Sequence, residues 1–264
     1  MTTGSHPTLT LTTLAGRPGD PLLVVGPSLA TSVSRVWGAT VGRLRGFHVV
    51  GWDLPGHGAS APHHEPLEVA DLAIAVLAAL DSLDGVDAST PFIHAGDSIG
   101  GAVTLRLLLD HPDRLRGGIV ACSSPVFGDP ANWTDRAAMV RSQGMGPIAE
   151  ASPGRWFGQQ VQQQPTDDTR AVAQEITSVD AESYARLCEA LAGYDVSEEL
   201  AAVTAPVLFI CGADDPVSPP DAMRQLSEGV GEGRLEVLQG VGHLAPLEAP
   251  DQVAGLIDDF VAQH

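Results

Sequence analysis

A serine set between two glycines is the feature of this 264-residue chain that most clearly indicates covalent chemistry. Gly96-Asp97-Ser98-Ile99-Gly100 fits the pattern G-x-S-x-G, and it joins an apolar segment to a helical pattern. In that context a cramped strand-to-helix turn exposes the serine hydroxyl, while small residues let the helix pass close to the strand. The sequence therefore predicts Ser98 as a nucleophile, with the Ile99 N–H facing the oxyanion that forms during attack.

An aspartate nucleophile is the alternative at this turn, because some hydrolases use a carboxylate in that position. Centring the motif on Asp97 would put Ala95 and Ile99 at the two glycine positions. Neither is glycine, and isoleucine in particular is too large for the close approach. The register of the motif therefore favours Ser98 over Asp97.

A serine hydroxyl becomes a nucleophile only when a neighbouring base takes its proton. His243 lies in a glycine-rich segment after the last expected strand, whereas His264 is the final residue of the sequence, where chains fray. We therefore predict His243 as the base. The acid that orients it is expected after the apolar segment 207–211, where Asp214 and Asp215 both fit the spacing.

Strand and helix patterns alternate along the chain and must position these side chains. Segments with strand patterns are 8–12, 21–25, 47–52, 91–95, 115–122, 207–211 and 235–238. Segments with helical patterns are 67–83, 99–109, 219–226 and 251–262. Continuous apolar strands that alternate with helices indicate an α/β fold, with a mostly parallel sheet flanked by helices on both faces.

The alternation stops between about residue 129 and residue 194, where the spacing is helical and no strand pattern is visible. We interpret this stretch as an inserted helical cap over the carboxyl ends of the strands, where ligands bind in such sheets. The predicted organisation is a core over residues 1–128, a cap over 129–200 and a second part of the core over 201–264.

Charge and composition exclude several classes of function. The net charge is −19, so the surface should repel nucleic acid and anionic membranes. Lysine is absent, which excludes Schiff-base chemistry and a phosphate-loop lysine, and we expect no cofactor and no metal. The three cysteines have no C-x-x-C spacing, no apolar run approaches ~18 residues, and the N-terminus lacks a signal-peptide pattern. A cytoplasmic location is the resulting expectation.

Short motifs that together resemble one known family are spread over nearly the whole chain. They are 26–32, Trp37, 53–60, 95–102, 107–112, 211–220 and 242–243, and, within the expected cap, Trp133 with Arg136, 140–141 with 144–145, and 155–157. Together these motifs resemble 3-oxoadipate enol-lactone hydrolases, a family of the α/β-hydrolase superfamily. The resemblance implies the α/β-hydrolase fold, Asp215 as the acid and the Leu29 N–H as a second oxyanion donor. Ala30 and Asp97 depart from the family pattern.

The resemblance also implies a substrate, since such an enzyme opens a carboxylate-bearing enol-lactone through an acyl-enzyme. On a chain of net charge −19, that carboxylate needs a local cation. Arginine binds carboxylate in a bidentate fashion, so Arg136, Arg141 and Arg155 of the expected cap are the candidates. Trp133 and Trp156 are expected to line the same pocket.

Two alternatives stay open at this point. The core motifs also fit another carboxylesterase, lactonase or carbon–carbon bond hydrolase of the superfamily, because a fold hosts many functions. A non-catalytic ligand receptor on the same scaffold is the alternative from another class. Such a receptor would give a stoichiometric burst without turnover.

Overall fold

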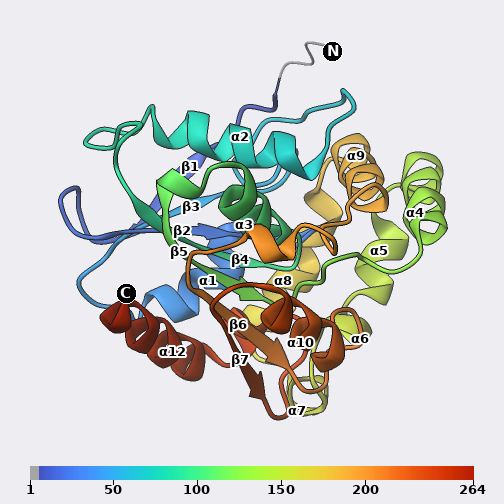
Figure 1. Ribbon diagram of the computed structural model, residues 1–264. Helices are drawn as coiled ribbons and strands as arrows, with labels where there is room; N and C mark the ends of the chain where they lie inside the picture. Colours follow the sequence, from blue (N-terminus) through green and yellow to red (C-terminus); the bar gives the residue numbers. More distant parts are fainter. Residues whose placement is uncertain (1–5) are drawn as a thin grey trace.

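The computed structural model describes residues 6–264 and is built on one seven-stranded sheet (Figure 1). The strand order is β1-β3-β2-β4-β5-β6-β7, in which β1 runs antiparallel to β3 and every other neighbouring pair is parallel. The strands are β1 Leu11–Ala15, β2 Leu22–Gly26, β3 His48–Trp52, β4 Phe92–Asp97, β5 Leu115–Ala121, β6 Val207–Gly212 and β7 Gly233–Leu238. The predicted α/β fold with a mostly parallel sheet is confirmed.

Helices cover both faces of the sheet, because successive residues of a strand point to opposite faces. Val24, Val50 and Phe209 pack with α2, α3 and α10, whereas Leu23 and Ile210 belong to the cluster formed with α1 and α12. The helices of this part are α1 Val33–Val41, α2 Val69–Leu80, α3 Ile99–Asp110, α10 Pro220–Gly229, α11 Ala245–Glu248 and α12 Pro250–Gln263, with short 3₁₀ turns at Pro112–Arg114 and Leu200–Ala202.

Most sequence-based boundaries differ from the observed ones by a few residues, and α1 was not anticipated at all. The expected first strand at 8–12 lies at Leu11–Ala15 instead. Helix α2 ends at Leu80 rather than at residue 83, because the backbone closes there into successive turns. Helix α1 buries Val33, Val36 and Trp37 under the sheet, and a stretch with polar residues between them concealed that apolar side.

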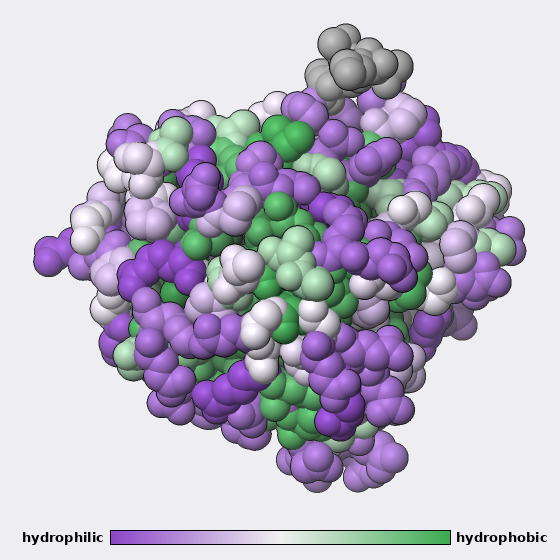
Figure 2. Space-filling view, viewed as in Figure 1, coloured by the Kyte–Doolittle hydropathy of each residue, from purple (hydrophilic) through white to green (hydrophobic). Residues whose placement is uncertain are grey.

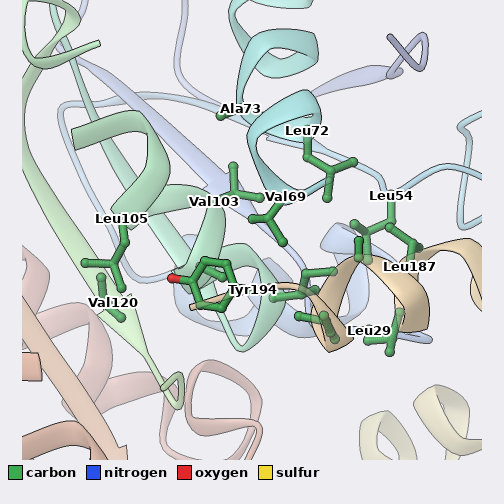
Figure 3. Close-up of a cluster of buried hydrophobic side chains, with 14 of the residues drawn as sticks. Leu29, Leu54, Val69, Leu72, Ala73, Val103, Leu105, Val120, Leu187 and Tyr194 are labelled. Carbon is green, nitrogen blue, oxygen red and sulfur yellow. The ribbon is translucent and has the colours of Figure 1, made fainter. Parts of the chain in front are cut away.

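The segment expected to form the cap is built from helices joined by loops, and most of it lies at the right of Figure 1. Its helices are α4 Pro130–Gln143, α5 Gly146–Ala151, α6 Pro153–Trp156, α7 Gln159–Gln163, α8 Asp167–Glu175 and α9 Ala181–Ala192, with a 3₁₀ turn at Ile176–Ser178. Helix α4 packs against α9. In Figure 3, Leu187 of α9 lies in one buried cluster with Leu29 and Leu54, so apolar contacts join this segment to loops after β2 and β3.

Hydrophilic and apolar residues are distributed unevenly over the surface (Figure 2). The face in Figure 2 is mostly hydrophilic at its edges, with apolar residues gathered toward the middle. None of the helices within residues 6–264 combines the length and apolarity that crossing a membrane requires. The three cysteines are buried and unpaired as thiols.

A buried histidine ties the centre of the sheet to the helix that follows it. The indole N–H of Trp52 donates to His94 Nε2 at 3.0 Å, so the proton of this neutral ring sits on Nδ1, 2.8 Å from the Thr104 hydroxyl. That hydroxyl donates to the Gly100 carbonyl oxygen at 3.0 Å. Burial lowers the pKa of His94 from 6.5 to about 3.

This histidine makes stability depend on acidity. Between pH 6.5 and about pH 3 the unfolded chain takes up a proton at His94 that the folded chain excludes. Its contribution to the free energy of unfolding is therefore complete above pH 6.5 and falls by ~1.4 kcal/mol per unit as the pH drops. Urea unfolding between about pH 7 and about pH 5 should show a shallower pH dependence for His94→Gln than for the wild type. Parallel curves would contradict this account.

Candidate active site

Ser98 occupies the turn between β4 and α3 in a conformation that few residues adopt. Its φ is 57° and its ψ is −116°, as expected for a strained strand-to-helix turn. Such backbone strain costs about 1–3 kcal/mol and persists only where the surroundings enforce it. Here the Ser98 N–H donates to the Ala121 carbonyl oxygen of β5 at 2.8 Å. The turn thereby holds the side chain at the carboxyl end of the central strand.

The two glycines of the motif are required by the space around them. A methyl group on Gly96 would lie 1.9 Å from the Gly100 carbonyl oxygen, and one on Gly100 would lie 2.7 Å from the Pro27 carbonyl oxygen. Both distances are far below van der Waals contact, so larger residues would separate α3 from the sheet. The steric reason given for the motif at the level of sequence therefore holds in the structure.

The structure brings Ser98, His243 and Asp215 together from three loops at the carboxyl ends of the strands. Ser98 Oγ lies 2.9 Å from His243 Nε2, and His243 Nδ1 lies 2.8 Å from Asp215 Oδ2. Asp215 Oδ1 accepts hydrogen bonds from the N–H groups of Val217 at 2.8 Å and Ser218 at 3.1 Å. Burial alone would raise the pKa of Asp215, but His243 and these N–H groups outweigh it, so the pKa lies below its ordinary value.

The choice between the two adjacent aspartates follows from this geometry. Asp214 is exposed and accepts a hydrogen bond from the Gln159 N–H at 3.2 Å, so its carboxylate points away from the imidazole. Asp215 is buried against His243. An ionised Asp215 favours the tautomer in which Nδ1 carries the proton and Nε2 is free to accept one from the serine.

Two backbone N–H groups are candidates for binding an oxyanion beside Ser98. Ile99 is the first residue of α3, where the N–H has no partner in the helix. Leu29 lies in the loop after β2 and lines the same pocket as Ser98. Neither N–H donates a hydrogen bond within residues 6–264. Both predicted donors are therefore free to bind a ligand.

His57 shapes the loop that carries Leu29, a role that sequence analysis did not foresee. Ala30 has a φ of 67°, a region that favours glycine, and its N–H donates to His57 Nε2 at 3.1 Å. His57 Nδ1 in turn lies 2.8 Å from the Pro55 carbonyl oxygen and donates to it. Burial lowers the pKa of His57 to about 4, so the ring is neutral near neutral pH and can accept the Ala30 hydrogen bond.

A pocket opens above Ser98 and His243 and is lined by four of the five predicted substrate-binding residues. They are Trp133, Arg136, Arg155 and Trp156. The guanidinium of Arg136 lies over the Trp133 ring at 4.7 Å, a cation–π distance. A second hollow of about 300 Å³ lies elsewhere, beside Asp20, His48 and Arg116, and its lining contains neither serine nor cysteine.

Arg141 lies outside this pocket, so the expectation that it binds the substrate carboxylate there is wrong. Its guanidinium bonds both carboxylate oxygens of Glu182, at 2.8 and 2.9 Å, and also pairs with Glu189 at 2.5 Å. The residue is exposed and does not line the pocket. Its charge is thus already matched by two acids of α9.

Sequence analysis assigned no binding role to several other pocket residues. They are Ser28, Phe127, Ile148, Ala151, Ser152, Tyr184 and Val217. Tyr184 stacks against His57 with ring centroids 6.4 Å apart, so α9 touches the loop after β3. The role of His57 could have been suspected from its position just after the carboxyl end of β3, because ligands bind at the carboxyl ends of the strands in such sheets.

A metal ion has one conceivable set of ligands among the described residues. The ligand atoms of Cys122, Asp215 and His243 lie within 4.8 Å of one another. However, Asp215 and His243 already hydrogen-bond each other, and burial raises the pKa of the Cys122 thiol well above its ordinary value. Because a thiolate rather than a thiol binds metal, these residues suit a proton relay better than a metal site.

Comparison with known proteins identifies the family to which this chain belongs. The family model described as serine aminopeptidase, S33 matches residues 43–250. The chain is 33% identical over 236 residues to 3-oxoadipate enol-lactonase 2 of Acinetobacter baylyi, covering 89% of this chain and 86% of that protein. It is 28% identical to 3-oxoadipate enol-lactonase 1 of the same organism, over 93% of this chain and 90% of that protein.

A solved structure gives the same result in three dimensions. The crystal structure of the enol-lactonase from Burkholderia xenovorans superposes with a TM-score of 0.90 at 27% identity, covering 96% of each chain. The chain therefore belongs to this serine aminopeptidase S33 family of the α/β-hydrolase superfamily. It is a hydrolase whose relatives include enol-lactonases.

The strained turn can be tested through its glycines. Gly96→Ala should lower the free energy of unfolding by about 3 kcal/mol, because the new methyl group overlaps the Gly100 carbonyl. Gly255→Ala is the matched control, since nothing lies within 4 Å of the added methyl group in the exposed side of α12. There alanine should stabilise by ~0.5–1 kcal/mol. Equal effects of the two substitutions in chemical denaturation would refute the steric argument.

Proposed function

We propose that this protein opens a carboxylate-bearing enol-lactone, 3-oxoadipate enol-lactone, to 3-oxoadipate through an acyl-enzyme on Ser98. The proposal rests on the residues that line the pocket around Ser98. Ser98 and His243 share one pocket with two arginines in a chain whose net charge is −19. Two enol-lactonases among the relatives support the same substrate.

The pairing of the arginines supports an anionic substrate. Arg141 and most other arginines form ion pairs with acidic side chains. Arg136 and Arg155 form none with any carboxylate of residues 6–264. In so acidic a protein an unpaired guanidinium at a pocket is well suited to bind a ligand carboxylate, and Arg136 is also oriented by the Trp133 ring.

The distances at the site support the proposed acylation step. The Ser98 oxygen attacks the lactone carbonyl carbon while its proton passes to His243 Nε2, 2.9 Å away. Asp215 stabilises the imidazolium, and the N–H groups of Leu29 and Ile99 bind the oxyanion. The ring C–O bond then breaks, and His243 returns the proton to the departing enol oxygen. The enol stays attached to the acyl chain and tautomerises to a ketone.

Deacylation uses the same groups with water as nucleophile. His243 removes a proton from the water as it attacks the ester carbonyl, and the Ser98 oxygen leaves with that proton. Lactone and one water thus give the 3-oxo diacid. The reaction needs no redox step, and the chain's own residues supply the base, the acid and the oxyanion donors. The proposed location is the cytoplasm, in keeping with the three free thiols.

Removal of the nucleophile is the direct test of the covalent mechanism. Ser98→Ala should reduce kcat for the enol-lactone by about 10⁴-fold or more, with an unchanged unfolding transition. Steady-state hydrolysis of the lactone, followed by its ultraviolet absorbance, measures this. Substantial activity in the variant would exclude the serine mechanism. A stoichiometric burst without turnover in the wild type would instead support the receptor alternative.

The arginines test the identity of the substrate. Arg136→Gln and Arg155→Gln should each raise KM for the enol-lactone by about 10–100-fold, the effect of losing a charged hydrogen bond. Arg141→Gln should leave KM within about twofold, because an exposed ion pair contributes little. For a lactone of the same ring size without the carboxylate, none of the three substitutions should change KM. Unchanged KM in both pocket variants would remove the carboxylate clamp, and a preference for neutral aryl esters would favour a general esterase.

A further inference from the structure

Glu248, at the end of α11, accepts three backbone hydrogen bonds with one carboxylate. Its Oε2 accepts from the Gly158 N–H at 2.8 Å. Its Oε1 accepts from the N–H groups of Gly242 at 3.1 Å and Leu244 at 3.3 Å. The two oxygens therefore serve two different segments of the chain, and no reaction step described above uses this side chain.

Each of these segments belongs to the site. Gly242 and Leu244 flank His243 directly, so Oε1 binds the loop that carries the base. Gly158 follows the pocket residues Arg155 and Trp156 closely in sequence, so Oε2 binds one wall of the pocket. The N–H of His243 also donates to the Trp156 carbonyl oxygen, which joins the same two segments a second time.

The two segments touch backbone to backbone. A methyl group on Gly158 would lie 2.3 Å from the Gly240 carbonyl oxygen, and one on Gly242 would lie 2.3 Å from the Trp156 carbonyl oxygen. No side chain could fit between them. Helix α7, which begins directly after Gly158, lies to the lower right of β7 in Figure 1.

The environment of Glu248 suits an acceptor that holds backbone rather than substrate. The side chain is partly buried and is not among the pocket-lining residues. Burial raises its pKa, while the N–H groups of Gly158, Gly242 and Leu244 and the nearby His243 oppose that rise. Because all three partners are N–H donors, only a group with two acceptor oxygens can satisfy them together.

We propose that Glu248 is a positioning residue whose carboxylate fixes the His243 loop and the pocket wall at Arg155–Gly158 to one common anchor. The inference rests on the proposed function, in which His243 is the base and this wall binds the substrate carboxylate. One side chain then determines both how the base meets Ser98 and how the substrate meets the base. Glu248 acts through these backbone segments and does not touch the lactone.

The proposal can be tested because each carboxylate oxygen of Glu248 binds a different segment. In Glu248→Gln only one oxygen remains, and it satisfies the most donors when it faces Gly242 and Leu244. The amide NH₂ then faces the Gly158 N–H, donor against donor, so the pocket wall is released while the loop of the base stays bound. Glu248→Ala releases both. Glu228→Gln, the same change at an exposed position of α10, is the matched control.

Hydrogen exchange of backbone amides tests the anchor without any assay of activity. Glu248→Gln should speed exchange at Gly158 by about tenfold or more while Gly242 and Leu244 keep their protection. Glu248→Ala should speed all three, and Glu228→Gln none. Unchanged exchange at Gly158 in both Glu248 variants would overturn the anchor, even if the enzyme proved to act on a different substrate.

Steady-state kinetics tests the positioning role. Glu248→Gln should raise KM for the enol-lactone by about tenfold with kcat within about twofold. Glu248→Ala should also lower kcat by about 10²-fold, because a small displacement of the base is enough for that loss. Equal loss of kcat in both variants, matched by equal loss of thermal stability, would reduce Glu248 to a structural residue and overturn the proposal.

The same set of variants separates the inference from the proposed function. If the wild type turns over no lactone or ester, or if Ser98→Ala stays active, the proposed function fails, whereas the exchange pattern still decides whether Glu248 anchors both segments. If the wild type and Ser98→Ala behave as expected but the Glu248 variants leave KM and kcat unchanged, the function stands and the positioning role is overturned.

Discussion

The strained turn at Ser98 is the constraint on which the rest of the site depends. Hydrogen bonds from three directions enforce it. The Ser98 N–H binds Ala121 of β5, the Ser98 carbonyl oxygen accepts from the Ser123 hydroxyl at 2.9 Å, and the Gly100 N–H binds the Pro27 carbonyl oxygen at 3.1 Å. Ser98, the proposed nucleophile, is therefore held by the centre of the sheet, where local unfolding costs the most free energy.

Asp215 and His243 are held differently from Ser98, because they lie on loops after β6 and β7, the last two strands of the sheet. Asp215 is fixed by N–H groups of its own turn, whereas the loop of His243 is fixed largely by groups outside it, namely the pocket wall and Glu248. The proposed nucleophile is thus held by the sheet, whereas the position of the proposed base depends on contacts with residues 156–158 and with Glu248. A displacement of the pocket wall would therefore also displace His243.

Sequence alone predicted the parts of the site that local constraints determine. Ser98 follows from the space that two glycines leave, and His243 from a glycine-rich loop after the last strand. Asp214 and Asp215 could not be separated by spacing, because the outcome depends on how one turn directs its carboxylates. Arg141 could not be excluded either, since its partner Glu182 is 41 residues away in sequence. Contacts of that range arise only from tertiary packing, as does the role of His57.

The excess of acidic groups has a consequence for the catalytic cycle. Ring opening of the proposed substrate converts a monoanion into a dianion, so the protein's own field opposes the product more strongly than the substrate. In the proposed reaction this repulsion favours release of the dianionic product, and binding of the substrate would depend on Arg136 and Arg155. Dissolved salt weakens repulsion over distances beyond about 10 Å more than it weakens a contact pair. Turnover of a charged lactone should accordingly tolerate, and at low substrate benefit from, a moderately saline medium.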